Sequence, residues 1–549
     1  MIKISKSKES EILSLLKNKN LKELEKIILS LTEEEKETPF ILNVVGILKI
    51  SKKVFFKNDA KEALMLFEKA YKKDKNFLDP LYNLASVSLK THIFGNVLKH
   101  LEDHIERVKY DLNAFTLLGS VNYQLGKIED SISYFKKTID KEETKKFHWQ
   151  NLLGISNYST SVSHRNYMEL GKKYSNSIKK FNKSDLENFK YSTNKEKIRI
   201  GFFSTNLRKH SVVNFLIETI KDLKLNNFEI IAFNQTHVED QTTKELKDIF
   251  SEWYDVHNLT DLETVNLIRN KKINILFDLV GYTEGSRMEI FKNRSAPIQI
   301  SWIGYTNSTC IDEVDYVIVD PNVIENKKNF TEKFIKLPDI WNCHIPLKEK
   351  LEVEELPALK NNYITYGSFN SFSKISDETI DIWSELLKKT NSRLILKSSS
   401  KRYIEGNNIL LNKFKKQGVN LKNIEILKGT ISYREHLKFY NSIDIALDTF
   451  PYNGVTTSFE SIWMGVPVLT IFGDTFNSRC GYSINKNLNL DEFIASNKDD
   501  FINKGVLVTS NLKKLSKLRK NLRLKALSSP LFDTKKFSKN FIEAINKVL

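Results

Sequence analysis

The stretch that decides the fold is residues 443–485, which read IDIALDTFPYNGVTTSFESIWMGVPVLTIFGDTFNSRCGYSIN. An apolar run at 443–447 predicts a buried strand, and a second run at 468–472 predicts another. Between them, Pro451 and Gly454 interrupt regular structure before a helix begins. This order of strand, tight loop, helix and strand is typical of a parallel sheet covered by helices.

The start of that helix, at Thr456 and Thr457, is a predicted anion site. A helix N-terminus presents unpaired backbone amides and a partial positive charge, and the two hydroxyls can donate to a phosphate. Gly454 lets the backbone approach closely because it has no Cβ. Glu460, one turn further on, could accept both hydroxyls of a ribose. The alternative is a capping box, since the spacing of Thr457 and Glu460 fits that signature without any ligand.

The chain on both sides of this segment also alternates strands with helices. We predict a Rossmann-like domain at 196–345 and a second one, with closing helices, at 346–549, separated by a linker within 321–362. The predicted fold is therefore α/β, with two doubly wound sheets that bind ligands at the carboxyl ends of their strands. The predicted strands are 198–203, 228–233, 273–280, 298–303 and 316–319, then 363–369, 394–396, 424–427, 443–447 and 468–472.

Lys374 lies in the loop that follows the first predicted strand of the second domain. A lysine there can meet the second phosphate of a leaving nucleoside diphosphate and stabilise the charge that develops on it. A solvated surface lysine is the alternative. The sequence contains no D-x-D, Walker A or H-E-x-x-H motif, so we expect phosphate charge to be met by lysine, hydroxyls and a helix dipole, without a metal.

Polar residues of the first domain also follow the carboxyl ends of predicted strands. His210 precedes Ser211, a plausible N-cap, and follows the first strand of that domain. Arg287 follows the strand at 273–280, and Tyr305 and Thr306 follow the strand at 298–303. A lone histidine at a helix start is usually structural, and each of the other residues could simply cap its own helix.

Residues 1–190 show helical periodicity and an internal repeat. A period of 34 residues, with a small residue in each of two helices, is typical of the tetratricopeptide repeat, and we expect about three copies. The concave face of such an array binds extended peptides or partner proteins, although a short array could merely cap the next domain. The positions that recur at 34 residues are Ala63, Val97 and Ser131, and Phe67, Leu101 and Phe135.

The 549-residue chain carries 85 Lys and Arg against 68 Asp and Glu, a net charge of +17. Such an excess can indicate nucleic acid or a membrane surface, but the lysines are interspersed with acids, so we expect neither partner. Cys310, Cys343 and Cys480 lack disulfide or zinc spacing. With no signal-like start and no apolar run long enough to span a bilayer, we expect a cytoplasmic protein.

The repeat array and five collinear segments resemble the O-linked N-acetylglucosamine transferase and SPINDLY family. The resemblance implies an inverting, metal-independent GT-B glycosyltransferase with no cofactor. It would move a sugar, expected to be N-acetylglucosamine from UDP-GlcNAc, to serine or threonine hydroxyls of proteins held by the tetratricopeptide groove. The segments are KIRIGFFSTNLRKHSVVNFL, FDLVGYTEGSRMEIFKNRSAPIQISWIGYTNS, GSFNSFSKIS, residues 444–479 and SPLFDTKKF.

By matching positions, the resemblance assigns catalytic roles to His210 and Lys374, the latter in contact with the diphosphate. It places Thr456 and Thr457 on the phosphates and Glu460 on the ribose, where animal members are expected to have aspartate. For Lys374, Thr456, Thr457 and Glu460 these roles agree with those that the residues suggest by themselves, whereas the role of His210 comes from the resemblance.

The resemblance also extends the donor-binding set. His436 matches a histidine near the nucleobase, and Ser371 stands where a glutamine is expected. Val455 replaces a histidine expected before the two threonines, so nucleotide contacts could differ from those of the animal enzymes. We include Tyr305 and Thr306 in the same donor-binding set.

Two other readings stay open. One keeps the fold and changes the chemistry, to fucosyl transfer from GDP-fucose or glucosyl transfer from UDP-glucose to asparagine. The other is a scaffold without catalytic activity, in which the repeats bind partners. The joint presence of His210, Lys374, Thr456, Thr457 and Glu460 argues against the scaffold.

Overall fold

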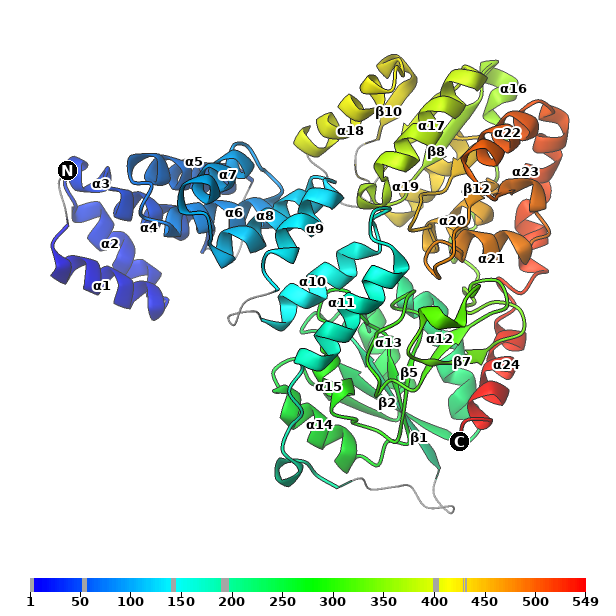
Figure 1. The fold of residues 1–549 in the computed structure, drawn as a ribbon, viewed down its shortest axis with the longest axis horizontal. Coiled ribbons are helices and arrows are strands. Elements are labelled where there is room, and N and C mark those ends of the chain that lie inside the picture. The colour runs from blue at the N-terminus through cyan, green and yellow to red at the C-terminus, as the bar shows by residue number, and fades with distance from the viewer. Residues whose placement is uncertain are drawn as a thin grey trace. The chain divides into compact units, whose positions relative to one another are not determined.

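The computed structural model describes residues 4–51, 57–139, 145–188, 197–397, 404–427, 429 and 432–549. The chain divides into two compact units, one of Met1–Thr144 with Lys401–Leu410 and the other of Lys145–Ser400 with Leu411–Leu549 (Figure 1). Across the described part of the chain, none of the helices is both long enough and apolar enough to cross a membrane.

The first unit is built from helices. Three successive antiparallel pairs, α4 with α5, α6 with α7 and α8 with α9, follow one another along the chain, as a repeat array requires. The helices are α1 (Lys6–Lys17), α2 (Leu21–Ser30), α3 (Glu33–Lys36), α4 (Pro39–Ile50), α5 (Lys57–Lys73), α6 (Asp79–Thr91), α7 (Val97–Val108), α8 (Leu112–Gln124) and α9 (Ile128–Lys136).

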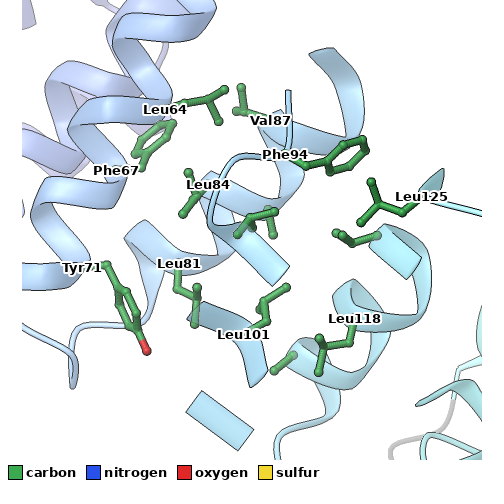
Figure 2. Close-up of a cluster of buried hydrophobic side chains, with 14 of the residues drawn as sticks. Leu64, Phe67, Tyr71, Leu81, Leu84, Val87, Phe94, Leu101, Leu118 and Leu125 are labelled. Atoms are coloured by element: carbon green, nitrogen blue, oxygen red, sulfur yellow. The ribbon is translucent and has the colours of Figure 1, made fainter. Parts of the chain in front are cut away.

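Small residues in this unit lie directly against aromatic rings of the paired helix. A Cβ on Gly46 would come within 2.5 Å of the Phe67 ring, and one on Gly119 within 2.7 Å of the Phe135 ring. The Ser131 hydroxyl also donates to the Gly119 carbonyl at 2.7 Å. The helices can therefore approach closely only because these positions are small. Figure 2 shows the apolar cluster that continues between the pairs, with Phe67, Leu84, Leu101 and Leu118.

The second unit contains two all-parallel sheets. The first has the order β3-β2-β1-β4-β5-β6-β7 and the second the order β10-β9-β8-β11-β12-β13. In each sheet the first strand in the chain, β1 or β8, lies inside the sheet, and later strands are added first on one side of it and then on the other, as in doubly wound sheets. The strands are β1 (Ile198–Ser204), β2 (Phe228–Asn234), β3 (Glu252–Asp255), β4 (Ile275–Asp278), β5 (Ile298–Ser301), β6 (Tyr316–Val319), β7 (Lys333–Lys336), β8 (Thr365–Ser368), β9 (Arg393–Leu396), β10 (Ile424–Ile426), β11 (Ile445–Leu447), β12 (Val468–Ile471) and β13 (Ile494–Ala495).

Helices cover both sheets, and the last of them returns to the first sheet. In α24 the Phe541 ring lies 4.5 Å from the Trp302 ring and 5.8 Å from the Phe277 ring, centroid to centroid. The helices after residue 144 are α10 (Lys146–Ser156), α11 (His164–Ser177), α12 (Ser211–Leu225), α13 (Gln241–Ile249), α14 (Asp261–Asn270), α15 (Met288–Lys292), α16 (Pro357–Asn361), α17 (Asp377–Thr390), α18 (Ile404–Lys416), α19 (Tyr433–Lys438), α20 (Thr456–Trp463), α21 (Cys480–Lys486), α22 (Lys498–Thr509), α23 (Leu512–Leu527) and α24 (Thr534–Asn546).

The predicted α/β fold with two doubly wound sheets is confirmed, but three of its strands were not predicted. β3, β7 and β13 are edge strands. β3 reads EWYD and β7 reads KFIK, so both lack the continuous apolar run by which buried parallel strands are recognised. Because β7 lies within 321–362, that stretch is part of the first sheet as well as a connection.

Helices α10 and α11 belong to the unit that contains the sheets, although we predict a helical domain up to residue 190. The Tyr167 hydroxyl of α11 donates to the Ser308 carbonyl at 2.8 Å, and the Lys146 ammonium of α10 bonds Asp261 at 2.9 Å. These contacts attach α11 to the loop after β5 and α10 to the start of α14.

Candidate active site

Lys374 ends the short 3₁₀ helix η3 (Phe372–Lys374), just beyond the carboxyl end of β8. Its ammonium donates to the Asn453 carbonyl at 2.7 Å and lies 4.0 Å from the centroid of the Tyr452 ring. Burial lowers the pKa of Lys374 to about 8, and the negative charge of Asp448 offsets part of that effect. The alternative of a solvated surface lysine is therefore wrong.

Asp448, which follows β11, is a buried acid that the sequence analysis did not select. Its carboxylate accepts from the Gly454 amide at 2.7 Å and from the Thr470 hydroxyl at 2.7 Å. Burial raises the pKa of Asp448 to about 6, while those bonds and the Lys374 charge act in the opposite direction. Asp448 thus fixes the loop that leads to α20 and supplies a negative charge close to Lys374. Its place immediately after a buried strand is the signal that could have found it.

Helix α20 begins at Thr456, and its N-cap residue, Val455, makes no side-chain hydrogen bond to the first turn. The capping-box alternative for Thr457 and Glu460 is therefore wrong. The Thr457 hydroxyl instead donates to Asn370 Oδ1 at 2.7 Å. Such an uncapped first turn leaves backbone amides available for an anion, as the sequence predicts.

Gly454 is required at this site for space. A Cβ there would lie 2.5 Å from the Thr457 hydroxyl and 2.6 Å from Asn370 Oδ1. The missing side chain therefore lets the β8 and β11 loops meet in front of α20.

A chain of hydrogen bonds joins Lys397, His436 and Glu460. The Lys397 ammonium donates to His436 Nδ1 at 2.7 Å, so the neutral ring carries its proton on Nε2, which donates to Glu460 Oε2 at 3.0 Å. The Tyr440 hydroxyl donates to the same Glu460 oxygen at 3.2 Å. The structure thus brings the two predicted nucleoside-binding residues together. Sequence reasoning missed Lys397, although it directly follows the predicted strand 394–396.

His210 lies beyond the carboxyl end of β1, in the position predicted for it. Helix α12 begins at Ser211, so His210 itself is the N-cap, and the prediction of Ser211 as N-cap is wrong by one residue. Its Nδ1 accepts from the Val212 amide at 3.3 Å, which places the proton of the neutral ring on Nε2. Desolvation, followed by the charge of Arg208, lowers the pKa of His210 to about 4, although the residue as a whole is exposed.

The helices that carry the two halves of the site pack against each other. Phe215 of α12 lies 5.4 Å from Phe459 of α20, centroid to centroid, in an edge-to-face arrangement. The buried ring of His344 contacts both, at 4.7 Å from Phe215 and 5.5 Å from Phe459. The N-termini of α12 and α20 are therefore held in a fixed relation.

The remaining predicted site residues lie in different surroundings. Tyr305 is buried, and its hydroxyl accepts from Asn157 Nδ2 at 2.7 Å and bonds the Tyr167 hydroxyl at 2.7 Å. Thr306 is also buried. Ser371 is exposed and belongs to the Lys374 turn, since its carbonyl accepts from the Lys374 amide at 2.9 Å. The structure thus joins Ser371 to Lys374, and Tyr305 to α10 and α11.

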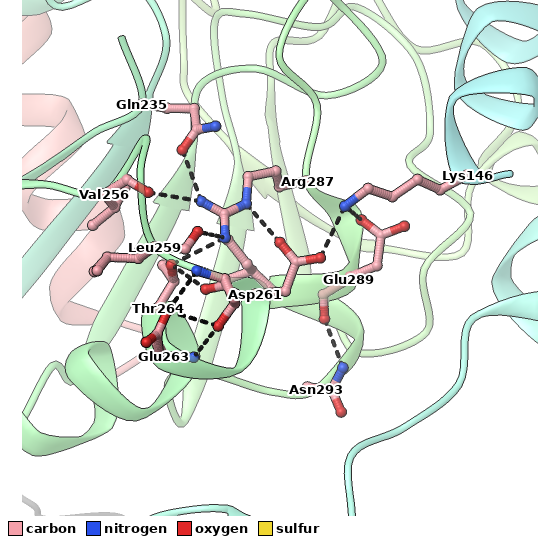
Figure 3. A network of polar contacts seen from close by, with 12 residues as sticks. Lys146, Gln235, Val256, Leu259, Asp261, Glu263, Thr264, Arg287, Glu289 and Asn293 are labelled. Atoms are coloured by element: carbon pink, nitrogen blue, oxygen red, sulfur yellow. Dashed lines mark hydrogen bonds and ion pairs between the residues drawn. The ribbon is translucent and has the colours of Figure 1, made fainter. Parts of the chain in front are cut away.

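Arg287 has a structural role in the first domain. Its guanidinium bonds Asp261 Oδ1 at 2.6 Å, Gln235 Oε1 at 2.8 Å and the Val256 carbonyl at 3.0 Å. Figure 3 shows these bonds converging on one side chain, with Lys146 beside Asp261. Because its guanidinium is already bonded to these protein groups, Arg287 holds the loops after β2, β3 and β4 together.

Comparisons with known proteins place the chain among protein glycosyltransferases. The chain is 31% identical over 356 residues to the probable UDP-N-acetylglucosamine–peptide N-acetylglucosaminyltransferase SPINDLY of Solanum lycopersicum, a match covering 63% of this chain and 38% of that protein. The probable N-acetylglucosaminyltransferase SEC of Arabidopsis thaliana is 27% identical over 360 residues, covering 63% and 36%. The chain therefore spans well under half the length of these relatives.

A solved structure has the same arrangement of domains along most of its chain. A mutant O-GlcNAc transferase of Thermobaculum terrenum superposes with a TM-score of 0.80 at 23% identity, over 94% of this chain and 98% of that one. The predicted GT-B arrangement of the two sheets is thus confirmed. The sequence pattern of glycosyl transferase family 41 matches residues 160–345 and 344–541, which include both sheets. The chain belongs to glycosyl transferase family 41.

Proposed function

We propose that this protein is an inverting, metal-independent glycosyltransferase that moves N-acetylglucosamine from UDP-GlcNAc to serine or threonine hydroxyls of proteins. The observation that carries the proposal is the partly buried Lys374 ammonium, held 2.7 Å from the Asn453 carbonyl just ahead of the α20 N-terminus. The names of the SPINDLY and SEC relatives, both peptide N-acetylglucosaminyltransferases, support the donor and the protein acceptor.

The leaving group is where these residues act. As the bond between the anomeric carbon and the diphosphate breaks, its electron pair stays on the diphosphate oxygen. The Lys374 ammonium and the first-turn amides of α20, including that of Thr457, stabilise that growing negative charge. The Thr456 hydroxyl adds a further donor, whereas the Thr457 hydroxyl donates to Asn370 Oδ1. The acceptor hydroxyl oxygen attacks the anomeric carbon from the opposite face, and so the configuration inverts. The hydroxyl proton passes to an oxygen of the departing diphosphate.

The nucleoside end of the donor is assigned to Glu460 and His436. Glu460 is buried, and the bonds from His436 and Tyr440 hold its carboxylate in place. A carboxylate fixed in this way can accept ribose hydroxyls without first losing side-chain freedom. We assign Ser371, Tyr305 and Thr306 supporting roles around the donor.

His210 is proposed to orient the reactants. With Nδ1 occupied by the Val212 amide, the neutral imidazole presents an N–H at Nε2, which can donate to an oxygen of the donor or the acceptor. The lowered pKa keeps the ring neutral near pH 7. His210 therefore contributes a fixed hydrogen-bond donor in this arrangement.

Protein acceptors are proposed to bind the helical unit. An open groove of about 280 Å³ lies there, and Met65, Ile93 and Phe94 are among its lining residues. Met65 is 70% exposed, so its side chain is accessible to a polypeptide in the groove.

The direct test is mass spectrometry of acceptor proteins after incubation with UDP-GlcNAc, GDP-fucose or UDP-glucose. We expect UDP-GlcNAc to label serine or threonine, and Lys374→Ala to reduce kcat by about 100- to 1,000-fold, as loss of one group that stabilises transition-state charge does. Lys389→Ala, on an exposed face of α17, is the matched control. Labelling by GDP-fucose or UDP-glucose alone would show that the donor assignment is wrong. Full activity of Lys374→Ala would contradict the proposed role of Lys374 in the mechanism.

A second test concerns the metal. Because a lysine and a helix N-terminus neutralise the diphosphate in this proposal, EDTA is expected to leave the transfer rate unchanged. Loss of activity in EDTA that added magnesium or manganese restores would contradict it.

A further inference from the structure

The aromatic ring of Tyr452 is in contact with the ammonium of Lys374. The ammonium lies over the face of that ring, 4.0 Å from its centroid, and donates to the Asn453 carbonyl at 2.7 Å. Cations are attracted to the negative face of an aromatic ring, most strongly where water is excluded. An ammonium has three N–H donors, so the carbonyl and the ring take up two directions and leave one for a ligand.

Two other contacts fix the position of Tyr452 itself. Tyr452 lies in the loop between β11 and α20, and the hydroxyl of the buried Thr449 donates to its carbonyl at 2.7 Å. The Tyr452 ring lies 4.9 Å from the ring of Tyr158, centroid to centroid, with 54° between the two planes. Because Tyr158 follows α10, the ring that contacts Lys374 is also in contact with the segment after that helix.

The other titratable groups that act on Lys374 are Asp448 and Cys480. The Asp448 carboxylate acts through its charge, while it accepts hydrogen bonds from the Gly454 amide and the Thr470 hydroxyl. Burial raises the pKa of the Cys480 thiol well above its usual value, so the thiol is neutral near pH 7. The Tyr452 ring adds a favourable contact for the charged lysine that depends on neither group.

We propose that Tyr452 is a positioning residue for Lys374, whose ammonium it holds over the face of its ring, and that Tyr158 keeps this ring in place. Lysine has a flexible stem, so an ammonium that is held before the donor binds loses less freedom when it meets the diphosphate. The ring also favours the charged form of the lysine. The effect on transfer rests on the proposed function, whereas the contact between ring and ammonium does not.

The role in transfer is tested with Tyr452→Leu and Tyr452→Phe. Leucine keeps an apolar side chain but has no aromatic face, whereas phenylalanine keeps the face and loses only the hydroxyl. We expect kcat to fall about 5- to 30-fold in Tyr452→Leu, the factor that corresponds to the usual strength of such a contact. Tyr452→Phe should keep most of the activity.

The contact itself is tested without any transfer reaction. Only the neutral amine of a lysine reacts with acetic anhydride, so labelling of Lys374 at a series of pH values, measured by mass spectrometry, reports its protonation. Half-maximal labelling is expected near pH 8 in the wild type and in Tyr452→Phe. It should move about one pH unit lower in Tyr452→Leu, because loss of the ring disfavours the charged form.

Tyr363→Leu is the matched control. The Arg393 guanidinium lies over the Tyr363 ring, 4.1 Å from its centroid, so this substitution removes a contact of the same kind. Tyr363 precedes β8, whereas Lys374 lies beyond the carboxyl end of that strand. Neither the labelling of Lys374 nor kcat should change in this variant, and thermal unfolding of each variant establishes that the fold is intact.

An unchanged titration of Lys374 in Tyr452→Leu, or the same shift in Tyr452→Phe, would overturn the proposed contact. A shifted titration with an unchanged kcat would refute the positioning role. Because the labelling needs no transfer, failure of the contact is separate from failure of the glycosyltransferase assignment.

The part played by Tyr158 is tested by combining substitutions. If Tyr158 acts through Tyr452, Tyr158→Leu should shift the titration of Lys374 to lower pH by a smaller amount, and it should have no further effect in Tyr452→Leu. No shift in the wild-type background, or an equal shift in both backgrounds, would refute this part of the proposal.

Discussion

Lys374, which is partly buried, and Asp448, which is buried, carry charges whose pKa values shift in opposite directions. Burial lowers the pKa of Lys374 to about 8 and raises the pKa of Asp448 to about 6, so the protein makes it harder for either group to be charged. Each charge partly compensates the other. An incoming diphosphate would supply further negative charge beside Lys374 and so favour its protonated form, which is the form that the proposed chemistry needs.

The first prediction at this scale is a pH profile. Lys374 must be protonated to stabilise the diphosphate, so kcat/KM, which reports the free enzyme, should fall as the pH rises above about 8. Lys374→Arg should have lower activity but no such fall, because a guanidinium stays charged at that pH. A wild-type profile that stays flat to about pH 10 would show that Lys374 does not titrate in this range.

The second prediction concerns Lys397, a positioning residue for His436. Replacing it by methionine removes the donor to Nδ1, so His436 can adopt the other tautomer and lose its bond to Glu460. We expect the KM for the nucleotide donor to rise about 10-fold, with a smaller change in kcat. Lys397→Arg should restore part of the affinity. Lys438→Met, on the same helix as His436, is the control, and equal kinetic effects of both substitutions would argue against this role.

At the scale of elements, the same kind of helix start has two different uses in this chain. α12 is capped by the side chain of His210, whereas α20 has no side-chain cap and follows a loop held by Asp448. Both helices begin at the carboxyl end of a strand, where ligands of parallel sheets bind. In the repeat array, by contrast, glycines set the helix spacing, since Gly46 and Gly119 lie against phenylalanine rings.

The prediction for this scale is that Gly119→Val destabilises the array. The added Cβ would approach the Phe135 ring within 2.7 Å, so the α8–α9 pair must separate or the ring must move. Overpacking of this kind costs typically about 1–3 kcal/mol. Asn113→Ala, at an exposed position of α8, is the control. Thermal unfolding followed by circular dichroism should show a lower Tm for Gly119→Val, and equal Tm values would contradict the packing argument.

For the molecule as a whole, the last helix, α24, completes a domain whose first strand, β1, begins at Ile198. α24 packs on α12 and on the first sheet, where Phe541 contacts Trp302 and Phe277. The Lys535 ammonium of α24 also donates to the Asp222 carboxylate of α12 at 3.0 Å. The helix that carries His210 at its start is therefore supported by residues that follow the second sheet.

We therefore expect Phe541→Ala to destabilise the first sheet domain. Truncating a fully buried phenylalanine to alanine lowers the free energy of unfolding by roughly 3–5 kcal/mol, and part of this loss comes from the cavity that remains. Limited proteolysis should open sites near α12, and the Tm should fall. Lys539→Ala, exposed on the same helix, should change neither. A stable Phe541→Ala protein that resists protease would mean that α24 is dispensable for the domain.

The sequence by itself determined the alternation of buried strands and helices, the repeat spacing, and the places of Lys374, His210 and Thr456 just beyond strands. These features are local, because each follows from the periodicity and turn residues of a short segment. Only the tertiary structure decided the partners. Thr457 meets Asn370, Glu460 meets His436, and Tyr305 meets Asn157. Such bonds join segments that are far apart in the chain, and their geometry depends on how the two sheets, with α10, pack together.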